Sequence, residues 1–166
     1  MRWFRFAAIV LVAAILQASL LNIIALPPLN IKPNILLIFL VFFAIHFNTT
    51  EAIITSFAIG FAADISIGAA MGSQTISFGL FGTALAYLHR VITIRSMPSQ
   101  ALAIFITGCL VGVLTHFLAL LKGQSTISNI YTAILGTALY SAIIGPFFFL
   151  PAAWFMGIKT HRFGRH

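Results

Sequence analysis

Asp64 is the residue with the strongest claim to chemistry in this chain, because it lies within an apolar segment predicted to span the membrane, near its outer end. An aspartate within a membrane span costs about 2.5–3.5 kcal/mol on insertion scales, so such a residue usually has a partner or a task. The groups predicted to share its side of the membrane are Lys32, His116 and Lys122. Two interpretations stay open: Asp64 pairs within the chain or reaches water at the interface, or it is a polar anchor for another molecule.

The residue types that usually carry catalysis are present but are not arranged for it. An intramembrane aspartyl protease needs two aspartates at one site, and this chain has one, with Glu51 at the opposite end of the same predicted helix. His46, His89 and His116 are scattered over three segments without an HExxH or His-x-x-x-His pattern. No spacing singles out a Ser–His pair either. The sequence therefore predicts no catalytic residue, no metal site and no cofactor.

Small residues at helical spacing are more informative about this chain. Gly108 and Gly112 form a GxxxG step, which lets two helices approach closely within a membrane. Packing inside the bundle is the favoured interpretation, and a dimer or partner face is the second. Gly68 and Gly72 follow Asp64 in the sequence. Together with Asp64 they form the candidate contact site for a partner.

The composition decides what kind of elements must position these residues. Of the 166 residues, 61% are apolar and only 7% are charged, with nine Lys and Arg against two Asp and Glu. A soluble domain carries about 25% charged residues because its surface faces water, so most of this surface must face lipid. A soluble enzyme, a disordered tail and a nucleic-acid binder are excluded despite the net charge of +7. The lone Cys109 excludes an intrachain disulfide.

Six apolar segments account for the chain as one membrane domain, an all-α integral membrane protein with six transmembrane helices. These segments are 6–26, 34–47, 50–67, 75–90, 99–121 and 127–149. Pro146 and Pro151 are expected to kink or fray the end of the last segment. Gln17 and Asn22 are expected to hydrogen-bond a neighbouring helix. The second segment is short, so the second and third are either two short spans or a re-entrant hairpin buried by the other helices.

The basic residues predict the orientation of the chain in the membrane. With six spans and both termini in the cytoplasm, Lys32 and Lys122 lie on the outer side, and all the other basic residues lie on the inner side. The inner residues are Arg2, Arg5, Arg90, Arg95, Lys159, Arg162 and Arg165. The loop around Arg90 and Arg95 is therefore expected to face acidic lipid or a cytoplasmic filament protein, or to serve as a topology signal alone.

Several of these patterns resemble those of the family of the rod shape-determining protein MreD. The matching stretches are Leu16-Gln17-x-Ser19-Leu20, Pro33-Asn34-Ile-Leu-Leu, and Gly60-Phe-Ala-Ala-Asp64 followed by Gly68 and Gly72. Asn34 departs from the family, which often has Asp after this proline. The resemblance implies a six-helix fold similar to that of the S-component of energy-coupling-factor vitamin transporters.

For function, the resemblance implies a non-enzymatic subunit of the cell-wall elongation complex in the bacterial inner membrane. The expected partner is a single-span protein of the MreC type, with an MreB-like filament and wall synthases nearby. The favoured contact is formed by the outer ends of the third and fourth segments, and a homodimer is a further alternative. The competing function is the substrate-binding subunit of a vitamin transporter. Its ligand would need several convergent polar groups, and the outer connectors offer mainly Asn30, Asp64, Ser73, Gln74 and Gln124.

Overall fold

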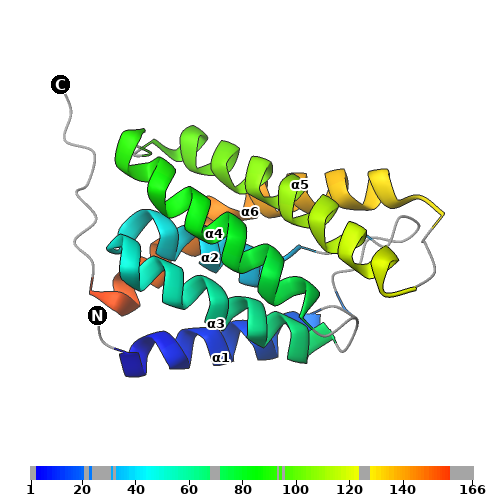
Figure 1. Ribbon diagram of the computed structural model, residues 1–166. Helices are drawn as coiled ribbons and strands as arrows, with labels where there is room; N and C mark the ends of the chain where they lie inside the picture. The colour runs from blue at the N-terminus through cyan, green and yellow to red at the C-terminus, as the bar shows by residue number, and fades with distance from the viewer. Residues whose placement is uncertain are drawn as a thin grey trace.

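The computed structural model contains six helices within the residues it describes, which are 3–20, 23, 31, 33–67, 72–92, 94, 96–123 and 128–157. The helices are α1 (Trp3–Leu20), α2 (Ile35–His46), α3 (Thr49–Ile67), α4 (Ser73–Val91), α5 (Met97–Leu121) and α6 (Ile130–Met156). They run alternately in opposite directions (Figure 1). We call the end where α1 begins and α4 finishes the basic end, because it carries Arg5 and Arg90. The opposite end, where α5 finishes and α6 begins, is the far end.

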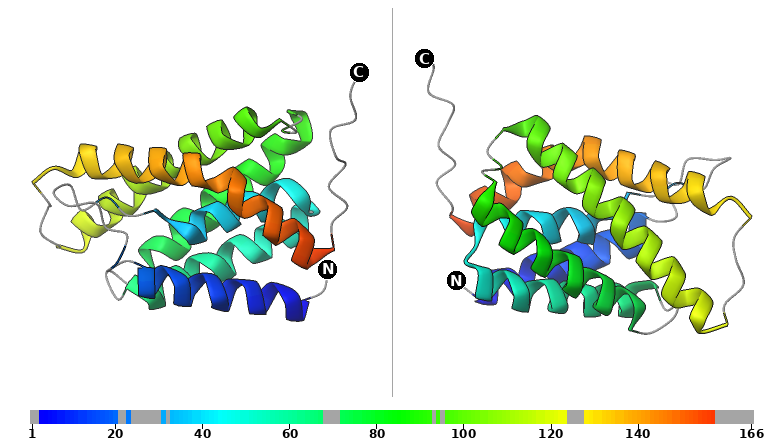
Figure 2. Two further views of the ribbon diagram at one scale, coloured as in Figure 1. Left: turned by 180° about the vertical axis from the view of Figure 1, so that it is seen from behind. Right: turned by 45° about the horizontal axis from the view of Figure 1, so that its top comes forward.

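The centre of the bundle is the short helix α2, which contacts all five other helices (Figures 1 and 2). Every residue from 35 to 45 is buried, as expected for a helix that is apolar on all its faces. Its 12 residues extend about 18 Å at 1.5 Å per residue, whereas the hydrocarbon core of a bilayer is about 30 Å thick. The central position of the bundle is therefore filled over only part of the membrane depth.

Two of the described helices, α5 and α6, are long and apolar enough to cross a membrane by length and composition. α1 and α2 are shorter apolar helices. Phe47 and Asn48 alone separate α2 from α3, and the two helices pack against each other. The short second segment of the sequence is thus one arm of a tight helical hairpin, with α2 on the inside of the bundle.

Two helices, α1 and α6, have ends that differ from the ends of the predicted segments. α1 ends at Leu20 and Ile23 lies in a turn, while the other residues predicted to continue the first segment to 26 lie outside the described residues. α6 continues to Met156 through Pro146 and Pro151, past residue 149, where the last predicted segment ends. Neighbouring helices make proline tolerable in an apolar helix, usually with a bend. Figure 2 shows such a bend in the second half of α6.

The α3–α4 pair packs closely because glycine stands at its contact points. A Cβ added at Gly60 on α3 would lie 2.7 Å from the Cα of Thr75 on α4, so the two backbones meet there. On the other side of the contact, the ring of Phe57 on α3 occupies the space beside Gly79 on α4. Close backbone approach through small residues is the usual way in which helices associate in lipid.

Candidate functional site

The carboxylate of Asp64 on α3 caps the N-terminus of α4. Its Oδ2 accepts hydrogen bonds from the backbone N–H groups of Gly72 and Thr75, both at 3.0 Å, and from the Thr75 hydroxyl. Its Oδ1 accepts from the N–H of Gln74 at 3.0 Å. These N–H groups belong to the start of a helix, where no intrahelical acceptor exists, and the negative charge also complements the positive end of the helix dipole.

α4 needs this cap from a neighbouring helix because its own N-cap residue is Gly72, which has no side chain. Gly72 also adopts a φ of 91°, in the left-handed region that favours glycine. Gly60 precedes Asp64 by one helical turn on the face of α3 where the α4 backbone approaches. The Gly60-Phe-Ala-Ala-Asp64 motif therefore has two physical roles: its glycine admits α4, and its aspartate caps it.

The structure places the rest of the predicted contact site as follows. Gly72 is half-buried at the far end, next to the amino group of Lys122, which lies 3.8 Å from where a Cβ of residue 72 would stand. Gly68 lies outside the described residues. Both oxygens of Asp64 are engaged by α4 and the residue is 6% exposed, so its carboxylate acts on the first turn of α4.

A second polar cluster holds the N-terminus of α2. The Oδ1 of Asn34 accepts from the N–H of Leu37 at 3.1 Å, and the N–H of Asn34 donates to the Oγ of Ser141 on α6 at 2.9 Å. The Oε1 of Gln17 on α1 accepts from the N–H of Leu36 at 3.0 Å. The prediction that Gln17 bonds a neighbouring helix is confirmed, while Asn22 lies outside the described residues. This cluster ties α1, α2 and α6 together.

A cavity of about 320 Å³ opens between α5 and α6 at the far end. Its base is the start of α2 and the first turn of α4, contributed by Asn34, Leu37 and Gln74. The polar residues of the walls are Thr115, His116, Thr137 and Ser141, among mainly small and apolar neighbours. The cavity, which we call the far cleft, exists because α2 is short and leaves the far halves of α5 and α6 without a helix beneath them.

Gln74 lines the base of the far cleft and contributes a buried hydrogen-bond acceptor beside it. Its Oε1 is buried and has no hydrogen-bond partner within the described part of the chain. A buried acceptor left unsatisfied costs about 1–3 kcal/mol, so a rotation of the Gln74 side chain toward a donor in the cleft would be favourable. Thr115, in contrast, donates its hydroxyl proton to Ser77 on α4 at 3.0 Å, which fixes one wall of the cleft.

Gly108 and Gly112 face α6 within the bundle. A Cβ at Gly108 would lie 3.1 Å from the Cβ of Ala138, and one at Gly112 would lie 2.8 Å from the Cγ2 of Ile134. Both glycines also line the far cleft. The GxxxG step therefore lies where α5 and α6 contact each other, beside the far cleft.

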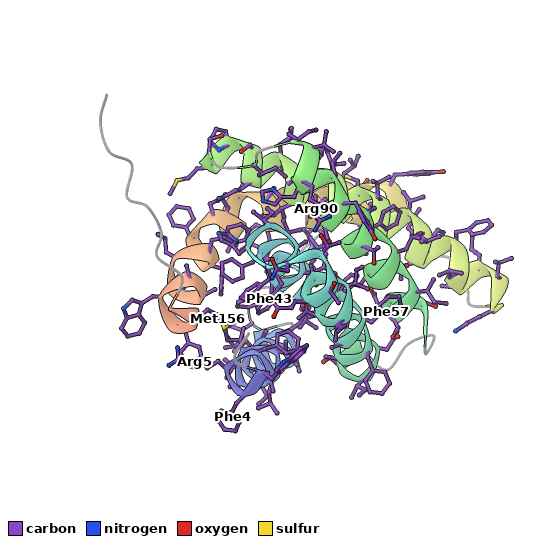
Figure 3. All side chains as sticks on the ribbon, turned by 60° about the vertical axis from the view of Figure 1, so that its left-hand side comes forward. Phe4, Arg5, Phe43, Phe57, Arg90 and Met156 are labelled. Atoms are coloured by element: carbon purple, nitrogen blue, oxygen red, sulfur yellow. The ribbon has the colours of Figure 1, made fainter. Side chains whose placement is uncertain are left out.

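At the basic end, Arg5 joins the first helix to the last. Its Nη1 donates to the backbone oxygen of Phe155 at 3.2 Å, and Figure 3 shows Arg5 beside the end of α6 that carries Met156, with Phe4 pointing away from the bundle. Arg90 is exposed near the end of α4. Arg95 lies outside the described residues. Of the two arginines predicted for this loop, only Arg90 is therefore among the described residues.

Sequence reasoning missed the far cleft and the part that Thr137 and Ser141 take in it. A signal existed, because these two residues lie one turn apart on an apolar helix, as do Gly108 and Gly112 on the facing helix. What the sequence could not show is the short α2 that leaves the space between them. Among the described residues, no group of three or more His, Cys, Asp or Glu side chains could hold a metal ion.

These features define a helical membrane protein in which polar side chains cap helix ends and a cleft opens at one end of the bundle. A family model described as rod shape-determining protein MreD matches residues 1–158. The chain belongs to the MreD family, as its motifs predicted, and is therefore a rod shape-determining membrane protein. No curated protein and no solved structure matches it, so the similarity to a transporter S-component stays a prediction.

Proposed function

We propose that this chain is a non-enzymatic subunit that holds a single-span partner of the MreC type beside the cell-wall elongation machinery. In this proposal it is one six-span domain in the bacterial cytoplasmic membrane, with the basic end and both termini in the cytoplasm. The alternating direction of the helices and the excess of basic residues in the inner segments of the sequence support this orientation. An MreB-like filament and wall synthases would then be reached through the partner.

The observation that carries the proposal is the far cleft with the unpartnered acceptor of Gln74. Helices in lipid gain nothing from hydrophobic burial against each other, so close packing and hydrogen bonds decide which partner binds. The far cleft offers apolar walls for packing, and Gln74 at its base can turn its unpartnered oxygen toward a donor of the partner. A segment of the partner close to the membrane surface fits these requirements.

Asp64 supports this contact as a positioning residue. It holds the first turn of α4 by four hydrogen bonds, and Gln74 belongs to that turn. The contact predicted for Asp64, Gly68 and Gly72 is therefore proposed in a more specific form, in which the turn after Gly72 presents Gln74 and Asp64 keeps the turn in place.

Co-purification of the tagged chain with a tagged MreC-type partner in mild detergent tests the proposal. Ala133→Phe places a ring in the far cleft and is expected to reduce the recovered partner at least tenfold. Leu135→Phe is the matched control, because residue 135 is on the same helix, 53% exposed and not part of the cleft wall. This control is expected to retain the partner.

Thermal unfolding of each purified variant separates a blocked cleft from a misfolded chain. A folded Ala133→Phe chain that retains the partner as well as Leu135→Phe does would refute the far cleft as the contact. Failure of the unmodified chain to recover the partner in several mild detergents would count against the subunit function itself.

A further inference from the structure

The turn between α4 and α5 at the basic end carries apolar side chains that point out of the bundle. Val91 is 83% exposed, Ile92 53% and Met97 50%. Tyr87 and Leu88 on the last turns of α4 are also about half exposed. We call this surface, together with the exposed Arg90, the α4–α5 rim.

The rim is a built part of the fold. Ile94, between the two helices, is 8% exposed and belongs to the hydrophobic core, so it fixes the turn against the bundle. The N–H of Ile92 closes α4 on the oxygen of Leu88 at 2.9 Å. Ser96 caps α5, because its Oγ accepts from the N–H of Ser99. The outward direction of Val91 and Met97 is therefore set by a turn that is anchored on both sides.

Arg90 is exposed next to Val91 in the sequence and has no counter-charge from the described part of the chain. None of the described hydrogen bonds involves its side chain, and no ion pair joins it to another described residue. The chain contains only two acidic side chains against nine basic ones. Asp64 is engaged at the far end, and Glu51 has an interaction of its own. Neither acidic side chain forms a described ion pair with Arg90, so its guanidinium is available to a negative group of another molecule.

The level of the rim along the membrane normal indicates which molecule supplies the negative group. Tyr87 on α4, Trp3 on α1 and Trp154 on α6 are all exposed at the basic end, at 55%, 49% and 85%. Aromatic side chains of this kind gather at the level of the lipid headgroups. Arg90 follows Tyr87 by about 4.5 Å along the helix axis, which places its guanidinium at the level of the phosphates.

We propose that the α4–α5 rim binds the headgroup of an anionic phospholipid in the leaflet that the basic end faces. The guanidinium of Arg90 pairs with the phosphate through two parallel N–H···O bonds, the geometry for which arginine is suited. Val91, Ile92 and Met97 insert among the upper parts of the acyl chains. This inference is independent of the partner proposed for the far cleft.

Fluorescence quenching in reconstituted vesicles tests the binding at this position. The full chain carries Val91→Trp as its only tryptophan, with Trp3→Phe and Trp154→Phe, and the vesicles contain brominated phosphatidylglycerol or brominated phosphatidylcholine. Quenching is expected to be stronger with the anionic lipid. Arg90→Gln in the same background is expected to lower this preference about fivefold, the size that corresponds to one basic residue near a charged leaflet.

A tryptophan at Leu121, which is 69% exposed at the far end, provides the control. Its lipid preference is expected to be the same with and without the Arg90→Gln substitution. Equal quenching by the two lipids at residue 91, or a preference that Arg90→Gln leaves unchanged, would overturn the proposal. Absence of quenching by either lipid would also overturn it, because the rim would then face water or a protein. Tyr87→Trp repeats the measurement from α4 if the first reporter does not fold.

Discussion

Four donors of one helix turn converge on the two oxygens of Asp64. Three of these donors are backbone N–H groups, which of all substitutions only proline would remove. Hydrogen bonds to a charged group contribute about 1.5–3 kcal/mol each to stability, although their contributions are not additive. Asp64 is therefore the residue at which the smallest chemical change is expected to affect the α3–α4 pair most.

A graded series at this cap distinguishes its charge from its shape. Asp64→Asn keeps one acceptor oxygen but points an NH₂ group at N–H donors, so we expect a loss of about 1.5–3 kcal/mol. Asp64→Leu is expected to cost more than Asp64→Asn, and Thr75→Val, which removes only one of the four donors, is expected to cost less than Asp64→Leu. Thermal unfolding in detergent and restoration of cell shape in a depleted strain measure the series.

Equal and complete loss with Asn and Leu, in chains that remain folded, would contradict a purely capping role. It would indicate that the carboxylate itself is required, for example by a partner.

At the residue scale, the sequence singled out Asp64 as a candidate functional residue but did not show which groups it contacts. Asp64 stood out because an acid in an apolar segment is costly. Its expected partners were the side chains of Lys32, His116 and Lys122, whereas the hydrogen-bonding groups are backbone N–H groups of residues 72–75. Backbone donors leave no trace in a sequence. Gly72, which cannot cap its own helix, was the indirect sign.

Among the elements, the α3–α4 pair depends on a backbone contact and the α5–α6 pair on side-chain contacts. The neighbour of Gly60 is the Cα of Thr75, whereas the neighbours of Gly112 are side-chain atoms of Ile134. A side chain can rotate away from an added methyl group, but a helix backbone must shift as a whole. Replacement of Gly60 by a larger residue is therefore expected to destabilise the folded chain more than replacement of Gly112.

Gly60→Ala is expected to destabilise the folded chain by about 1–3 kcal/mol, the usual cost of overpacking. Gly112→Ala is expected to cost less, because its nearest neighbours are atoms of one side chain, Ile134, and not the backbone of the facing helix. Thermal unfolding of both variants in the same detergent provides the comparison. A larger loss at Gly112 than at Gly60 would contradict the backbone contact between α3 and α4.

The helices themselves could largely be predicted from apolar runs and prolines, and their packing could not. Asn34 after Pro33 predicted where the second helix begins, and its side chain does accept from the N–H of Leu37. The last helix extends past the predicted segment that ends at 149, because Pro146 and Pro151 break an isolated helix but not one supported by neighbours. The central position of α2 required knowledge of all five helices around it.

For the whole molecule, the distribution of charge supports the proposed orientation in the membrane. Both described arginines, Arg5 and Arg90, lie at the basic end, whereas Lys122 lies at the far end. Arginine and lysine near the ends of spans favour the cytoplasmic side. The proposed topology can be tested without knowledge of any partner.

Single cysteines in a Cys109→Ser background report the topology. A cysteine at Ser96, in the α4–α5 turn, is expected to resist a membrane-impermeant thiol reagent in intact cells and to react after the membrane is permeabilised. A cysteine at Asn129, at the start of α6, is expected to react from outside. Both positions are exposed in the bundle, so burial does not explain a lack of reaction. The reverse pattern would invert the proposed orientation.

The enclosure of α2 has a consequence for how the chain enters the membrane during synthesis. A segment of about 18 Å is too short to be stable across a bilayer as an independent helix, and the N–H of Leu36 is satisfied by Gln17 only after α1 is in place. We therefore expect α2 to leave the insertion machinery together with α3, as a pair joined by Phe47 and Asn48. The order of insertion is then set by α2, the helix that the other described helices enclose.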